Sequence, residues 1–197
     1  RLHSATDLPC LIEGETGSGK ELIARRIHHG GTPKTNRPFI AINCAAIASG
    51  LFEAELFGYA PGAFTGAVSG GSQGKLALAA GGTVLLDELA DLPLDQQAKL
   101  LRVLEDRTWY PVGSSVLQRL TARIVGACNT DLLERVRSGR FREDLYYRLD
   151  VIPIFVSPLR DRPEDIVPLA ESFLRRYAHQ NSSQVQSFSE EVLKSFL

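Results

Sequence analysis

A glycine-rich turn near the start of the chain limits its possible folds more than any other stretch. It has the spacing GxxxxGK and consists of Gly14, Glu15, Thr16, Gly17, Ser18, Gly19 and Lys20. Glycines let backbone N–H groups turn toward an anion, and the lysine and the positive end of a helix dipole add favourable charge. The apolar run Cys10–Ile12 precedes the turn, and the helical pattern Glu21–Ile27 follows it. This order predicts a loop that binds nucleotide phosphates. One residue departs from the pattern, because Glu21 stands where Ser or Thr usually holds Mg²⁺.

The composition describes an ordinary globular protein. The chain has 197 residues, 44% apolar and 23% charged, with a net charge of −1, so nothing in its overall charge favours nucleic acid or anionic membranes. No apolar run approaches the roughly 18 residues of a membrane span. We therefore expect a cytoplasmic protein without a membrane partner. The three cysteines, Cys10, Cys44 and Cys128, lie far apart in apolar runs, which favours buried free thiols over a disulfide or a metal site.

Short β-branched runs alternate with helical stretches, which predicts an α/β fold with a parallel sheet covered by helices on both faces. The five predicted strands are Leu8–Glu13, Pro38–Asn43, Thr83–Asp87, Arg123–Cys128 and Val151–Val156. The predicted helices are Gly19–His29, Ile47–Phe57, Leu94–Asp106, Asp131–Arg137 and Arg142–Leu149. A hairpin is predicted over Thr108–Leu117, around its Gly-Ser pair, with Trp109 as a packed aromatic.

The domain organisation follows from the same pattern. Residues 1–157 form the predicted nucleotide-binding core, with an inserted glycine-rich loop at 58–74. Residues 158–197 are a linker and the beginning of a second, helical subdomain, with helices over Ile166–His179 and from Ser189 onward. We expect this subdomain to be incomplete.

Polar residues at the ends of other strands supply the second half of a nucleotide site. Asp87 and Glu88 end the apolar strand that follows Gly81 and Gly82. In an open α/β sheet, ligands collect at the carboxyl ends of the strands. There Asp87 can hold Mg²⁺, partly through water, and Glu88 can deprotonate an attacking water. Either acid alone could equally cap a helix or face solvent.

Two asparagines end strands at the same predicted edge. Asn129 follows the strand Arg123–Cys128, and Asn43 ends the second strand. An amide there can bond to a γ-phosphate or to the attacking water. Taken alone, each is more often a turn or cap residue.

One segment is not required by nucleotide chemistry. Flexible glycines flank an aromatic ring and a hydroxyl in the six residues Gly62, Ala63, Phe64, Thr65, Gly66 and Ala67. This GAFTGA stretch resembles the signature of the AAA+ ATPase domain of bacterial enhancer-binding proteins, the NtrC-like activators of sigma-54 RNA polymerase. The resemblance extends to GETGSGKE with its Glu21, GGTVLLDE, Asn129 and the stretch Phe141–Leu149. It covers essentially the whole chain.

The resemblance implies a function and a set of roles. Similar proteins form homo-oligomeric rings, usually hexamers, that hydrolyse ATP with Mg²⁺ at subunit interfaces and remodel the closed complex of the sigma-54 RNA polymerase holoenzyme. By this likeness Arg142 and Arg148 are arginine fingers for the neighbouring subunit, although their residue types alone favour structural salt bridges. By the same likeness, Asn43 matches the residue that restrains the catalytic glutamate Glu88, Asn129 matches the first sensor, and Phe64 and Thr65 match the loop tip that contacts sigma-54. DNA binding is expected only through a domain outside this chain, and the helical subdomain corresponds to a lid. The implied catalytic set is Lys20, Asp87, Glu88, Asn129, Arg142, Arg148 and Asn43.

Three positions depart from the family pattern. Ala60 and Ala77 replace usual glutamates near the loop, and Cys128 replaces a usual threonine before the sensor. None of them removes a catalytic group. Two other functions stay open from the residues: a nucleotide-dependent assembly module with little turnover, suggested by the charge of Glu21, and a P-loop kinase or transferase, for which no acceptor pocket is legible.

Overall fold

The computed structural model describes residues 8–30 and 36–195. The chain divides into two compact units, Arg1–Val156 and Ser157–Leu197. We call the first the α/β unit and the second the helical unit, and each is described by itself.

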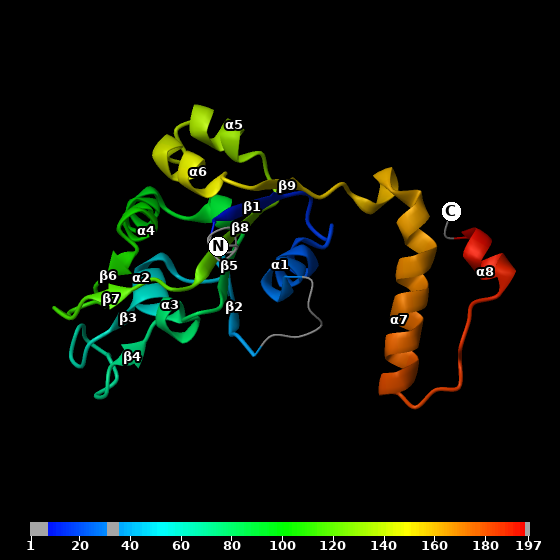
Figure 1. Ribbon diagram of the computed structural model, residues 1–197, viewed down its shortest axis with the longest axis horizontal. Helices are drawn as coiled ribbons and strands as arrows, with labels where there is room; N and C mark the ends of the chain where they lie inside the picture. Colours follow the sequence, from blue (N-terminus) through cyan, green and yellow to red (C-terminus); the bar gives the residue numbers. More distant parts are fainter. Residues whose placement is uncertain (1–7, 31–35, 196–197) are drawn as a thin grey trace. The chain divides into compact units, whose positions relative to one another are not determined.

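A five-stranded parallel sheet forms the centre of the α/β unit (Figure 1). Its strand order is β2-β5-β8-β1-β9, and every neighbouring pair is parallel. The strands are β1 (Cys10–Glu13), β2 (Phe39–Asn43), β5 (Thr83–Asp87), β8 (Arg123–Cys128) and β9 (Pro153–Phe155). These are the five predicted strands, and the structure trims up to three residues from their ends. Because the strands are parallel, the residues that follow β1, β2, β5 and β8 meet at one edge.

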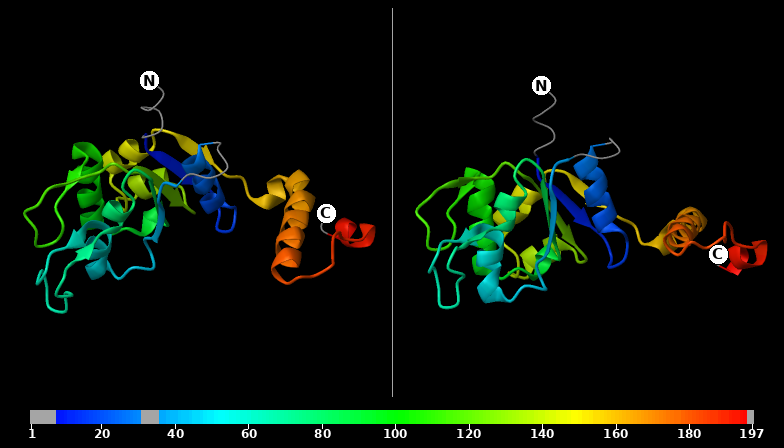
Figure 2. Two further views of the ribbon diagram at one scale, coloured as in Figure 1. Left: turned by 60° about the horizontal axis from the view of Figure 1, so that its bottom comes forward. Right: turned by 90° about the horizontal axis from the view of Figure 1, so that it is seen from below.

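The strands alternate their side chains between two apolar layers. Helices cover both faces of the sheet (Figure 2). On one face, Cys10, Ile12 and Leu85 pack with Ala24 of α1 (Lys20–His29). On the other face, a larger cluster joins Leu11, Val84 and Leu86 to the helices that cover it. Those helices are α2 (Ser49–Phe57), α4 (Leu94–Asp106), α5 (Leu132–Arg137) and α6 (Glu143–Leu149). The predicted helical cover of both faces is therefore present.

The ends of the short helices follow from their capping residues. The Asp131 carboxylate accepts hydrogen bonds from the backbone N–H groups of Leu133 and Glu134, so α5 begins one residue later than predicted. Arg142 is likewise the N-cap of α6 and not its first helical residue. Predicted and observed bounds of α1 and α4 agree to within one residue.

The predicted hairpin is present, but its strands are paired differently. Strand β6 (Thr108–Trp109) pairs with β7 (Gln118–Arg119), and residues 110–117 form the connection. The prediction that strand residues directly flank Gly-Ser was wrong. Pro111 has no N–H to donate to a ladder, and Val112 uses its backbone groups to bond to Gly58 and Ala60. On the other side of the connection, Val116 and Leu117 are exposed.

A small antiparallel ribbon at the base of the GAFTGA loop was not predicted. Strand β3 (Gly58–Tyr59) pairs with β4 (Ser72–Gln73), and α3 (Lys75–Leu78) follows. A Cβ atom on Gly74 would lie 2.3 Å from the backbone nitrogen of Gly58. The ribbon thus depends on glycine at a point where two backbones touch.

The remaining elements are short, apart from one long helix. A 3-10 turn, η2 (Leu89–Asp91), joins β5 to α4. The helical unit contains two 3-10 turns, η3 (Leu159–Asp161) and η4 (Pro163–Asp165), then α7 (Ile166–Gln180) and α8 (Glu190–Ser195). Both predicted helices of this unit are present. Within the described part of the chain, no helix has the length and apolar character that a membrane crossing needs.

Candidate nucleotide site

The glycine-rich turn adopts the backbone that its sequence predicts. Gly17 and Gly19 have φ values of 82° and 99°, a region that favours glycine. Gly19 directly precedes α1, whose N-terminus therefore faces the loop. The buried Lys20 donates from Nζ to the carbonyl oxygens of Gly14 and Glu15, at 2.7 and 3.0 Å. The lysine is thus held against the loop, where phosphate oxygens could replace these two carbonyls as its acceptors.

A pocket of about 370 Å³ lies beside this loop. Its lining comes from the loop, from α1 and from the ends of β5 and β8. The lining residues are Thr16, Gly17, Gly19, Lys20, Glu21, Leu22, Asp87, Glu88 and Asn129. Residues that are more than 100 positions apart in the sequence therefore meet in one cavity, as the strand-end argument predicts.

The two acids differ in backbone conformation. Asp87 ends β5, and its Oδ1 accepts from the N–H of Glu88 at 3.0 Å. Glu88 has φ 53° and ψ 41°, the left-handed region, which is uncommon for a residue other than glycine. Such backbone strain is concentrated at functional sites. The turn directs the chain from the strand into η2, and both acids line the pocket.

Both predicted asparagines lie at the same sheet edge. Asn129 donates from Nδ2 to the Thr16 hydroxyl at 3.3 Å, so the end of β8 contacts the glycine-rich loop directly. Asn43 is opposite Asp87 in the β2–β5 register. Its Oδ1 accepts from the N–H groups of Ala45 and Ala46, which is a turn-capping role. Asn43 does not line the pocket.

Arg142 and Arg148 belong to the α6 region and are not among the residues that line the pocket. Arg142 forms a two-pronged ion pair with Asp144, with N···O distances of 3.0 and 2.7 Å. This pairing lowers the pKa of the Asp144 carboxyl and raises the pKa of Arg142. Arg148 donates to the carbonyl oxygen of Leu104 at 3.0 Å. Neither arginine therefore completes the pocket of its own chain.

The GAFTGA loop projects from the β3–β4 ribbon, next to the β6–β7 hairpin (Figure 1). The hairpin holds the base of the loop, since Val112 exchanges backbone hydrogen bonds with Gly58 and Ala60, at 2.8 and 2.9 Å. Trp109 is buried and donates from Nε1 to the carbonyl oxygen of Phe57 at 3.0 Å. At the tip, the Phe64 ring packs edge-on against Tyr59, with centroids 5.0 Å apart.

The sequence argument missed two polar residues near these groups. Glu13 ends β1, and its Oε1 accepts from the N–H of Leu132 at 3.3 Å and lies 3.7 Å from the Cys128 sulfur. Gln97 is a fully buried amide on α4. Each could have been found as a polar residue in an apolar pattern: Glu13 after Cys10–Ile12, and Gln97 on the helix face of Leu100, Leu101 and Leu104.

The cysteines are buried free thiols. Among residues 8–30 and 36–195, no three His, Cys, Asp or Glu side chains are grouped so as to hold a metal ion.

Comparison with known proteins agrees with this geometry. The profile of the Sigma-54 interaction domain matches residues 1–155. The chain belongs to the sigma-54 interaction domain family. Its relatives in this family include the response regulator protein FleR of Pseudomonas aeruginosa, 51% identical over 88% of this chain, and the DNA-binding transcriptional regulator NtrC of Rhizobium meliloti, 48% identical over 96%. The chain spans 36% of the length of FleR and 38% of that of NtrC.

Solved structures support the same family. NtrX of Brucella abortus superimposes with a TM-score of 0.78 at 37% identity, covering 91% of this chain and 41% of NtrX. The complex of NtrX with ATP gives a TM-score of 0.77 at 36% identity, over 91% of this chain and 40% of NtrX. The predicted α/β fold, a five-stranded parallel sheet with helices on both faces, is thereby confirmed.

Proposed function

We propose that this chain is the ATP-hydrolysing central domain of a sigma-54-dependent transcriptional activator. The main support is the pocket that joins the glycine-rich loop to Asp87, Glu88 and Asn129, in a chain of the sigma-54 interaction domain family. The complexes of NtrX with ATP and with ADP support a nucleotide as the ligand. Binding to a promoter would require a part of the protein outside this chain.

In the proposed reaction, water attacks the γ-phosphorus of ATP, and the bond to the β–γ bridging oxygen breaks. Glu88 accepts the proton of the water, and Lys20 offsets charge on the phosphates. Asn129 lies beside Thr16, close enough to the loop to bond to the γ-phosphate or to the water. Asn43 uses its amide oxygen in the turn that follows, which leaves its amide nitrogen to restrain Glu88.

Asp87 is suited to hold Mg²⁺, because carboxylate oxygen is a preferred ligand of this ion and Asp87 lines the pocket. When bound, the ion would offset charge that develops on the phosphate oxygens. Glu21 is not needed for this task, since its carboxylate is paired with Arg25 at 2.7 Å along the same helix.

The same ion pair weakens the case for a nucleotide-dependent assembly module without turnover. That alternative depends on a negative charge of Glu21 beside the phosphates, and the guanidinium of Arg25 offsets this charge. The strained, pocket-facing Glu88 favours hydrolysis, because simple binding requires no positioned base.

We further propose a ring, usually a hexamer in this family, in which Arg142 and Arg148 reach the γ-phosphate bound by the next subunit. Both lie outside the pocket of their own chain. Arg142 is on the surface, and exchanging Asp144 for phosphate would retain a two-pronged pairing. The ring would couple hydrolysis to motion of the GAFTGA loop, whose Phe64 and Thr65 contact sigma-54.

Replacing the proposed base tests hydrolysis directly. We expect Glu88→Gln to bind ATP like the unaltered protein and to lose at least about 100-fold in hydrolysis rate, the usual contribution of a general base. Binding of a fluorescent ATP analogue and release of phosphate are the two measurements. Hydrolysis within a few-fold of the unaltered rate would exclude Glu88 as the base.

Replacing the loop hydroxyl tests the proposed output. We expect Thr65→Ala to hydrolyse ATP normally, because Thr65 is outside the pocket, but to fail in binding sigma-54 and in opening its promoter complex. Exposed Ser69 of the same loop offers a control, since Ser69→Ala also removes one hydroxyl. Normal promoter opening by Thr65→Ala would refute the assignment of the loop.

A further inference from the structure

A buried glutamine on α4 joins two parts of the proposed machinery. Gln97 is 0% exposed, and burying an amide is costly unless its polar atoms are paired. Its Nε2 donates to the carbonyl oxygens of Leu92 and Arg140, at 2.7 and 3.1 Å. Its Oε1 accepts from the backbone N–H of Arg142 at 2.8 Å. One side chain therefore satisfies three buried or partly buried backbone groups.

Those three groups belong to two functionally different segments. Leu92 follows η2, the turn that begins directly after Glu88. Arg140 and Arg142 lie in the connection between α5 and α6, where Arg142 caps α6. Gln97 thus connects the segment that follows Glu88 to the backbone of Arg142. Glu88 belongs to the subunit's own site, and Arg142 is proposed to act in the site of the next subunit.

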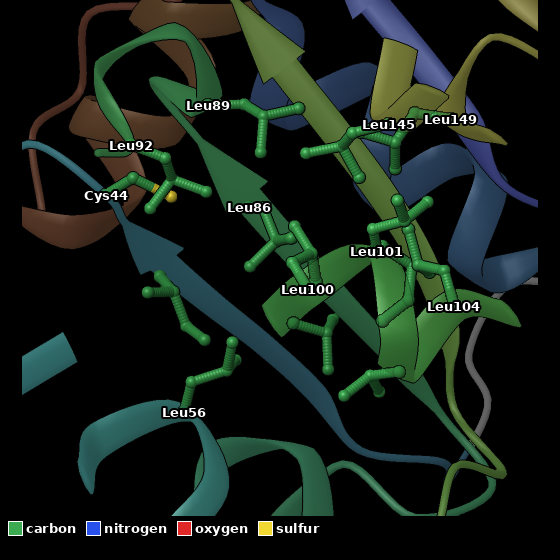
Figure 3. Packing of buried hydrophobic residues seen from close by; sticks show 14 of the residues in the cluster. Cys44, Leu56, Leu86, Leu89, Leu92, Leu100, Leu101, Leu104, Leu145 and Leu149 are labelled. Atoms are coloured by element: carbon green, nitrogen blue, oxygen red, sulfur yellow. The ribbon is translucent and has the colours of Figure 1, made fainter. Parts of the chain in front are cut away.

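The neighbouring apolar contacts would keep α4 and α6 together without Gln97. Leu101 and Leu104 of α4 belong to the same buried cluster as Leu145 and Leu149 of α6 (Figure 3). Among the described residues, the exposed Arg142 side chain pairs with Asp144, two positions along the same segment. Asp144 holds the guanidinium, and Gln97 holds the backbone from which the side chain starts.

We propose that Gln97 is a positioning residue for Arg142: it fixes where a subunit presents this arginine to the neighbouring nucleotide site. The inference rests on the proposed ring ATPase. Because a misplacement of about 1 Å in a positioned group can cost about 100-fold in rate, loss of the three hydrogen bonds should lower kcat and leave the KM for ATP unchanged.

Gln96 provides a matched control. It is also buried, but among the described residues its Nε2 donates to Asp95 of its own helix alone, at 2.8 Å. We expect Gln97→Met to lower kcat by about 10-fold to 100-fold, whereas Gln96→Met keeps it. If Gln97→Met does not fold, Gln97→Asn carries the same test, because its amide is one methylene too short to reach all three partners.

Mixed oligomers separate a positioning role from a general loss of structure. A Gln97→Met subunit has an intact acid and a misplaced arginine, whereas a Glu88→Gln subunit has the reverse. In an equal mixture, about a quarter of the interfaces would combine the intact acid with the intact arginine if subunits mix at random. We therefore expect the mixture to hydrolyse ATP well above either variant alone, as should a mixture of Arg142→Ala with Glu88→Gln.

Two results would overturn the inference. One is a Gln97→Met protein as active as Gln96→Met. The other is a Gln97→Met mixture that stays inactive while the Arg142→Ala mixture recovers. If the Arg142→Ala mixture also fails to recover, or the unaltered protein does not hydrolyse ATP, the proposed function is overturned and this inference with it.

Discussion

Burial raises the pKa of two thiols near the pocket to about 12, from an ordinary value of 9.0. For Cys44 the nearby carboxylates of Asp87, Asp91 and Glu88 add to the effect of burial, and for Cys128 the carboxylate of Glu13 does so. Both thiols therefore remain protonated in the folded chain at pH values where they ionise in the unfolded chain.

This difference predicts a pH dependence of stability. The raised pKa favours the folded state fully below pH 9, and this contribution is lost as the pH rises from 9 toward 12. We expect the free energy of unfolding, measured by urea denaturation, to fall over this window. In the double variant Cys44→Ala, Cys128→Ala, the free energy of unfolding should fall less steeply, because the two thiols no longer contribute. Some fall remains, because other groups titrate in both proteins. Equal slopes would contradict the assignment.

At the scale of elements, the base of the GAFTGA loop is the most restricted junction. A Cβ atom at Gly74 would meet backbone atoms of Phe57 and Gly58 at 2.3 Å, whereas one at Gly70 would meet nothing within 4 Å. We expect Gly74→Ala to lower the free energy of unfolding by about 1–3 kcal/mol through overpacking. Gly70→Ala should change it by less than about 0.5 kcal/mol.

The same two variants test whether the base of the loop affects ATP binding or sigma-54 binding. ATP binding should survive Gly74→Ala, because the pocket is built by other elements. Engagement of sigma-54 should weaken, because the β3–β4 ribbon and the hydrogen bonds to Val112 position the loop. Urea unfolding and a sigma-54 binding assay check the two effects. A Gly74→Ala protein as stable as Gly70→Ala would show that the ribbon accommodates the added Cβ atom without a loss in free energy of unfolding.

For the whole molecule, the pocket of one chain lacks the proposed arginines. If Arg142 comes from a neighbour, ATP hydrolysis per subunit should rise steeply with protein concentration and then reach a plateau as assembly completes. Arg142→Ala should lower the rate of ATP hydrolysis by about 1,000-fold or more, the usual contribution of an arginine finger. A rate per subunit that is independent of concentration, down to dilutions where light scattering finds only monomers, would contradict a shared site.

The sequence alone determined the local chemistry and the order of elements. Gly14–Lys20, the acids after β5 and the alternation of strands with helices depend on residue type and spacing, which are properties of short stretches. They were sufficient to predict five parallel strands and a phosphate-binding loop. The strand ends and the second side of the hairpin were misplaced, because pairing partners decide where a ladder begins and ends.

Only the tertiary structure decided how distant residues combine. It shows the Asn129 amide against the Thr16 hydroxyl, 113 positions away. It also shows that buried Gln97 bonds to backbone groups up to 45 positions away. These contacts depend on strand order and helix packing, which arise from burial of the whole apolar surface and leave no signal within a short stretch of sequence.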